Sequence, residues 1–133
     1  MSKIHIQVIM PNDKKLDDIV SRAILPGIEG DFEVLEGHTA FITKLRPGIL
    51  KVYKGEVAEY FALHDGFVTV EEDKITVLSE NCECKKDINL ERASAAKIRA
   101  EKRIADTGNT GIDFRRAEIA LKRAITRIDT VNH

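Results

Sequence analysis

The feature that most constrains the fold is a change in hydrophobic periodicity near residue 87. Before this point apolar residues recur in short runs, with a period of two over residues 4–8, and turn formers separate the runs. After it, apolar residues step by three and four over residues 90–104 and again over 114–128. A chain of 133 residues therefore combines a β part with two helices.

The β part contains roughly eight or more short strands in about 80 residues, a spacing typical of a sandwich or barrel. Proline, glycine and aspartate pairs supply the turn signals. Among them, Asp65-Gly66 is expected to reverse the chain between two strands.

The helical part is expected to be an antiparallel hairpin, because only a loop of turn formers over residues 106–111 separates its two apolar stripes. Asn89 or Asp87 is the expected N-cap of the first helix, and Asp113 that of the second. Both stripes are rich in alanine, which allows close packing but buries little apolar area. We therefore expect the hairpin to lean on the β part, a ligand or another protein, and to be able to detach.

The charge of the chain is divided unevenly between these parts. Residues 1–87 hold 11 Lys/Arg and 16 Asp/Glu, a net of −5, whereas residues 88–133 hold 10 and 6, a net of +4, and the two recover the total of −1. A near-neutral total argues against a surface devoted to nucleic acid. No apolar run reaches the roughly 18–20 residues of a membrane span, and the N-terminus lacks an apolar signal core.

The sequence offers no catalytic motif. None of the four histidines stands in a nucleophile or metal-ligand pattern, and there is no Walker-type phosphate loop. Cys82 and Cys84 lie two residues apart and are expected to be reduced thiols, because that spacing matches neither a zinc set nor an easily closed disulfide. We therefore predict a non-catalytic protein without a metal site.

Arginines are concentrated on the predicted hairpin at helical spacing. Each helix carries three at steps of seven and four, namely Arg92, Arg99 and Arg103, then Arg116, Arg123 and Arg127. Arginine is suited to two-pronged contacts with phosphate or carboxylate. Four interpretations stay open here: a solvated helix face, a nucleic-acid contact, an acidic protein surface and a nucleotide phosphate. Phe114 is the tail's one aromatic residue, which disfavours nucleic acid.

Several segments resemble one known family, the epsilon subunits of bacterial F-type ATP synthases, and the likeness covers essentially the whole chain. The segments are residues 26–38 (Pro-Gly through Gly-His), 45–48 (Leu-Arg-Pro-Gly), 65–70 (Asp-Gly-Phe-Val-Thr-Val) and 113–124 (Asp-Phe-Arg-Arg-Ala-Glu-Ile-Ala-Leu-Lys-Arg-Ala). The resemblance implies an α+β fold, with an N-terminal β-sandwich of about ten strands over residues 1–86 and a C-terminal antiparallel two-helix hairpin over residues 87–133.

The resemblance also implies a role as a non-catalytic rotor subunit of the central stalk. The sandwich would contact the gamma subunit and the c-ring and help couple proton transport to ATP synthesis. The extended hairpin would present its six arginines to the catalytic alpha and beta subunits and inhibit ATP hydrolysis. Such a subunit is peripheral, at the cytoplasmic face of the bacterial cell membrane, without inserting into it or binding nucleic acid.

In some members of the family the folded hairpin binds ATP through the motif Ile/Leu-Asp-x-x-Arg-Ala, and residues 88–93 (Ile-Asn-Leu-Glu-Arg-Ala) follow it with asparagine in place of aspartate. The resemblance implies that the ATP contacts are Glu83, Ile88, Asn89, Arg92, Ala93, Arg99, Arg123 and Arg127. No cofactor is required, ATP is a regulatory ligand, and the role of Mg²⁺ stays open. The alternative is a small ATP- or nucleic-acid-binding module that uses the arginine-rich hairpin.

Overall fold

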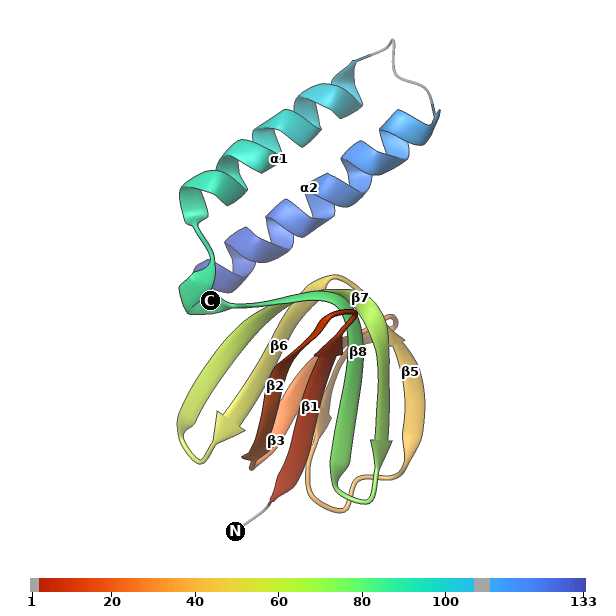
Figure 1. The fold of residues 1–133 in the computed structure, drawn as a ribbon, viewed down its shortest axis with the longest axis vertical. Coiled ribbons are helices and arrows are strands. Elements are labelled where there is room, and N and C mark those ends of the chain that lie inside the picture. The colour runs from red at the N-terminus through yellow and green to blue at the C-terminus, as the bar shows by residue number, and fades with distance from the viewer. Residues whose placement is uncertain (1–2, 107–110) are drawn as a thin grey trace.

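A computed structural model of the chain describes residues 3–106 and 111–133, and it contains a β-sandwich with a helical hairpin at one end (Figure 1). The described strands are β1 (Ile4–Met10), β2 (Asp13–Val20), β3 (Arg22–Gly27), β4 (Gly30–Val34), β5 (Phe41–Leu45), β6 (Gly48–Lys54), β7 (Val57–Glu71) and β8 (Lys74–Cys84). These eight strands are fewer than the ten or so expected, because two of them are long.

The long strand β7 holds the sandwich together. Along one edge its first half pairs with β6 and its second half with β5, while β8 runs antiparallel along its other edge. The remaining order runs β2-β1-β8-β7-β5-β3-β4, with β1 and β8 parallel and β6 also paired with β3. One continuous strand of 15 residues therefore belongs to both layers of the sandwich.

The core follows from the alternation seen in the sequence. Ile4, Ile6 and Val8 are fully buried, whereas the side chains between them are half-buried at the surface of β1. The same period of two buries Val68 and Val70 of β7. Branched aliphatic side chains from most of the strands meet in one cluster, which provides the main hydrophobic stabilisation of the molecule.

The prediction of a turn at Asp65-Gly66 is wrong, because both residues lie inside β7 and Gly66 pairs with Ser79. Their backbones carry positive φ angles of 53° and 144°. A Cβ built on Gly66 would lie 2.0 Å from the carbonyl oxygen of Leu78. The glycine therefore permits a close approach of two paired strands rather than a reversal of the chain.

The helical part begins with a short 3₁₀ turn, η1 (Lys85–Asp87), followed by α1 (Leu90–Ala105) and α2 (Gly111–Val131). Both predicted helices are present, and Asn89 is the N-cap of α1. Asp113 is not an N-cap, because α2 already begins at Gly111 and this aspartate lies in its first turn. Part of the predicted loop, residues 107–110, lies outside the described residues.

Small side chains form the contact between the two helices. Ala93 and Ala100 of α1 and Ala117 and Ala124 of α2 are all buried, as the alanine-rich stripes predicted. Helix α2 also packs on β6 and β7, so it carries the contacts that join the hairpin to the sandwich. Among the described helices none is both long and apolar enough to cross a membrane.

Candidate functional site

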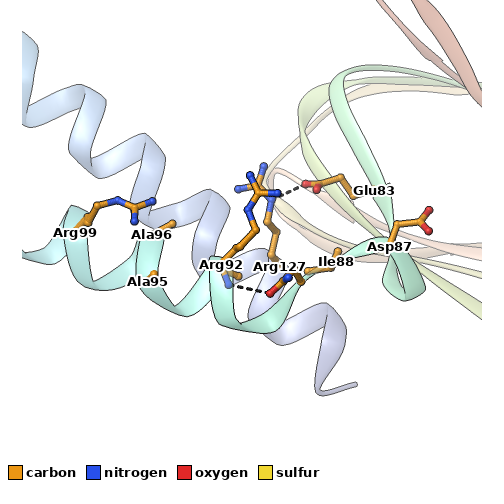
Figure 2. A pocket seen from close by; sticks show the side chains of 10 residues that line it. Glu83, Asp87, Ile88, Arg92, Ala95, Ala96, Arg99 and Arg127 are labelled. Carbon is orange, nitrogen blue, oxygen red and sulfur yellow. Dashed lines mark hydrogen bonds and ion pairs between the residues drawn. The ribbon is translucent and has the colours of Figure 1, made fainter.

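A cleft of about 430 Å³ opens where the hairpin meets the sandwich. Its walls come from the end of β8, η1, the first turns of α1 and the last part of α2 (Figure 2). The residues that line it are Glu83, Asp87, Ile88, Asn89, Arg92, Ala93, Ala95, Ala96, Arg99 and Arg127. The cleft therefore brings together segments about 40 residues apart in the chain.

Seven of the eight residues implied as ATP contacts line this cleft, and Arg123 does not. Arg123 is half-buried one turn before Arg127 on α2, and its Nε atom is buried without a hydrogen-bond partner among the described residues. Asp87, Ala95 and Ala96 line the cleft but were not foreseen. For the two alanines a signal existed, because they stand three and four positions after Arg92 and so share its side of the helix.

One carboxylate joins the two parts of the molecule. Glu83 Oε1 on β8 lies 2.5 Å from Arg127 Nε on α2 and 3.1 Å from Nε2 of the fully buried His64 on β7. The hydrogen bond from His64 and the neighbouring Arg127 guanidinium lower the pKa of Glu83 to about 2, against the opposing effect of burial. Glu83 therefore stays ionised and ties the hairpin to the sandwich.

Asn89 acts as a cap in the structure. Its side-chain oxygen accepts a hydrogen bond from the backbone N–H of Arg92 at 3.0 Å. An asparagine fills this role about as well as an aspartate does, but it adds no negative charge to the start of the helix. The positive end of the α1 dipole therefore faces the cleft without an adjacent carboxylate on the cap.

Two arginines give the cleft its capacity for an anion. Arg92 and Arg99 are exposed on α1, and neither guanidinium has an ion-pair partner within the described part of the chain. In Figure 2 Arg92 lies near the start of α1 and Arg99 further along it, and both line the cleft together with Arg127. The small alanines on this side leave the helix surface open, so a phosphate chain can approach both guanidiniums.

The six arginines of the two stripes differ in their surroundings. Arg92, Arg99, Arg103 and Arg116 are exposed, whereas Arg123 and Arg127 are half-buried in the docked hairpin. Arg127 is already paired with Glu83. The arginines therefore do not form one uniform exposed surface while the hairpin is docked.

The other candidate groups have ordinary chemistry. Burial raises the pKa of the Cys82 thiol to about 12, and both cysteines are free. The described residues contain no group of three or more histidine, cysteine or acidic side chains that would hold a metal ion.

A second feature lies on the outer face of the sandwich. Ile42 on β5, Phe67 on β7 and Leu78 on β8 are 69%, 52% and 51% exposed. Phe67 pairs directly with Leu78 across the strands, and Ile42 lies one diagonal step away, opposite Thr69. Three large apolar side chains on one face are typical of a surface that contacts protein.

The comparisons with known proteins follow the same division of the chain. Residues 3–85 match the family described as "ATP synthase, Delta/Epsilon chain, beta-sandwich domain", and residues 86–132 match "ATP synthase, Delta/Epsilon chain, long alpha-helix domain". The ATP synthase epsilon chain of Halalkalibacterium halodurans is 36% identical over 97% of both chains. That of Desulforapulum autotrophicum is 42% identical over 96% of this chain and 95% of its own.

Solved structures share the fold. A chain of the Euglena gracilis mitochondrial ATP synthase (OSCP/F1/c-ring) is 21% identical, with a TM-score of 0.86 over 100% of this chain and 83% of that one. A chain of the Tetrahymena thermophila mitochondrial ATP synthase central stalk and c-ring is 15% identical, with a TM-score of 0.67 over 97% and 96%. The sandwich with a terminal hairpin is therefore a fold found in assembled ATP synthases.

Proposed function

The chain belongs to the delta/epsilon chain family of ATP synthase, and from this premise we propose that its hairpin regulates the enzyme by binding ATP in the docked state. As an epsilon-type chain it is a non-catalytic subunit of the central stalk. The observation that carries the proposal is the cleft at the hairpin junction, where the exposed Arg92 and Arg99 line the same space as an ionised Glu83.

The cleft offers a nucleotide groups of both kinds, cationic and hydrogen-bond accepting. Arg92, Arg99 and the start of α1 provide positive charge for the phosphates. Glu83 provides a hydrogen-bond acceptor for the amino group of the base. A ligand held by residues of both β8 and α1 would stabilise the docked hairpin, because it binds that state and not the extended one.

The same arrangement explains how the hairpin would inhibit hydrolysis when it detaches. Extension would free Arg127 from Glu83 and expose Arg123, so all six arginines would become available to acidic surfaces of the alpha and beta subunits. ATP would oppose this change by holding the hairpin on the sandwich. Inhibition would then be strongest when ATP is scarce.

The sandwich would supply the fixed attachment to the rotor. Ile42, Phe67 and Leu78 form an exposed apolar surface suited to the gamma subunit, and the sandwich would also touch the c-ring. Through these contacts the subunit would turn with the rotor and help couple proton transport to ATP synthesis. We place it at the cytoplasmic face of the bacterial cell membrane, as a peripheral subunit.

The experiment is calorimetric titration of ATP, with and without Mg²⁺, into the full chain. We expect saturable binding that weakens at least about tenfold in Arg92→Ala, since a hydrogen bond to a charged group contributes roughly 1.5–3 kcal/mol. Arg115→Ala is the matched control, because Arg115 is exposed on α2 but does not line the cleft. Equal affinity in all three proteins, or no binding at all, would contradict the proposed site.

The regulatory half is tested in the assembled enzyme. We expect ATP hydrolysis to rise when residues 88–133 are deleted, and expect added ATP to relieve inhibition in the intact subunit but less so in Arg92→Ala. Hydrolysis that is unchanged by the deletion would contradict an inhibitory role.

A further inference from the structure

His64 is a fully buried titratable side chain whose position the nucleotide contacts do not explain. It lies on β7 opposite Asn81 of β8, and its Nε2 atom points to Glu83. Its Nδ1 atom is buried without a partner in the described part of the chain. A proton on Nδ1 would be a buried donor without an acceptor, which is costly, so the ring carries its proton on Nε2 and donates it to Glu83.

The two oxygens of the Glu83 carboxylate have different surroundings. Oε1 receives both N–H donors, one from His64 inside the sandwich and one from Arg127 on the hairpin. Oε2 accepts no hydrogen bond from the described residues, and Glu83 lines the cleft. Oε1 therefore links the sandwich to the hairpin, and Oε2 is available to a ligand.

From this geometry we infer that His64 is a positioning residue, which fixes the Glu83 carboxylate so that Oε1 anchors Arg127 and Oε2 remains an acceptor in the cleft. The anchoring half of this inference, Oε1 with Arg127, rests on protein contacts alone. The ligand-facing half, Oε2 as an acceptor in the cleft, rests on the proposed function. His64 cannot follow the hairpin, since it is enclosed by the sandwich, so Glu83 stays aimed at the junction when α2 leaves.

The charged and titratable groups around this carboxylate support the assignment. They are His64 on β7, Asp87 in η1, Arg92 and Arg99 on α1, and Arg127 on α2. Of the effects that lower the pKa of Glu83, the hydrogen bond from His64 is the largest and the bond from Arg127 comes second. His64, which stays in the sandwich, and Arg127, which can leave with the hairpin, therefore both keep the Glu83 carboxylate ionised.

The first test follows the carboxyl carbon of Glu83 by NMR against pH, in the full chain without nucleotide. The wild type should titrate at a pKa of about 2. In His64→Leu the pKa should rise by a unit or more toward 4.5, the ordinary value, while His64→Gln, which keeps an N–H donor, should lie between the two. A folded His64→Leu protein with an unchanged Glu83 pKa would overturn the inference.

A second variant leaves the buried residue intact, in case His64→Leu does not fold. In Arg127→Gln we expect the Glu83 pKa to remain well below 4.5, because His64 still donates to the carboxylate. A return to 4.5 would show that Arg127 alone held the carboxylate, and would overturn the inference.

ATP titration at pH 7 separates this inference from the proposed function. If ATP binds the wild type, we expect a loss of about threefold or more in His64→Leu and a smaller loss in His64→Gln. Equal ATP affinity in wild type and His64→Leu would overturn the ligand-facing half. A wild type that does not bind ATP would overturn the proposed function, while the Glu83 titration still decides the anchoring half.

Discussion

The sandwich and the hairpin are stabilised to very different degrees. The sandwich encloses large aliphatic side chains, among them Ile6, Leu25, Leu50 and Ile75, each fully buried. Burying such a side chain contributes roughly 1.5–3 kcal/mol. The helix pair encloses mainly alanine methyl groups, at about 0.8 kcal/mol each. A stable platform therefore carries a hairpin that a few contacts hold in place.

This difference is what a switch requires. The hairpin joins the sandwich through α2 and a small number of polar contacts, such as Arg127 with Glu83 and the Lys85 amine with the His133 carbonyl at 2.8 Å. When only a few kcal/mol favour the docked hairpin, the binding of one ligand or one partner surface can shift the equilibrium. A change in the sandwich should therefore unfold the protein, whereas a change in the hairpin should move an equilibrium.

The largest expected effect is in the sandwich, with Gly66→Ala. The new Cβ would meet the Leu78 carbonyl at 2.0 Å, and the φ of +144° disfavours any L side chain. We expect about 4 kcal/mol of lost stability, or no folded protein. The measurement is denaturant unfolding of the full chain.

Gly37→Ala is the control for this change. Gly37 also has a positive φ, of +81°, but nothing lies within 4 Å of an added Cβ. It should cost only about 1 kcal/mol of backbone strain. Equal losses in the two variants would mean that the close approach of β7 and β8 does not limit this position.

The next effect is in the hairpin, with Ala124→Leu. Ala124 is fully buried between the helices, and three added carbons would push them apart. We expect about 2 kcal/mol of destabilisation confined to the hairpin. Hydrogen exchange should therefore speed up in α1 and α2 and stay unchanged in the strands. Ala120→Leu, on an exposed face of α2, should leave hydrogen exchange unchanged in both the helices and the strands.

A smaller effect concerns the junction, with Glu83→Gln. The pKa of Glu83 is about 2 in the folded chain against an ordinary 4.5, so its ionised form stabilises the fold above pH 4.5 and that stabilisation is lost as pH falls through 2. The variant should be less stable by about 1 kcal/mol at pH 7, and the gap should close toward pH 2. Parallel unfolding curves from pH 7 to 2 measure it, with the exposed Glu101→Gln as control.

Local patterns predicted the parts of the fold that depend on local contacts. The period of the apolar residues located both helices, and the Asn89 cap follows from its place before the first stripe. The Asp65-Gly66 turn failed because pairing with β8 overrides the turn preference of that dipeptide. Its glycine is needed for an approach to Leu78, which lies outside any local window.

The candidate site also depends in part on long-range contacts that no local sequence pattern reveals. The resemblance brought Glu83, Arg92, Arg99 and Arg127 together, and the structure places them around one cleft. It did not indicate His64, because the contact with Glu83 arises only when β7 and β8 pair in their observed register. Arg123 does not line the cleft and is half-buried on α2, one turn before Arg127.

The smallest expected effect is Asn89→Asp, which introduces the aspartate that the resemblance implies at this position of the motif. Both side chains can accept from the Arg92 N–H, so the cap itself should be unchanged. The added negative charge at the start of α1 should stabilise the helix by about 0.5 kcal/mol at low salt. That gain should fade at high salt, because salt screens a charge at the surface of the cleft.

Asn89→Ala is the contrasting variant, because it removes the cap without changing the charge. It should cost about 1 kcal/mol at any salt concentration. Thermal unfolding of the hairpin, measured in low salt and in about 1 M salt, distinguishes the two variants. In about 1 M salt the screening length falls to roughly 3 Å. A salt-independent gain in Asn89→Asp would mean that the introduced carboxylate forms a buried ion pair in the cleft. The hairpin would then be tied to the sandwich by more than Glu83 and α2, and the contrast in stability between the two parts would be smaller than their buried side chains imply.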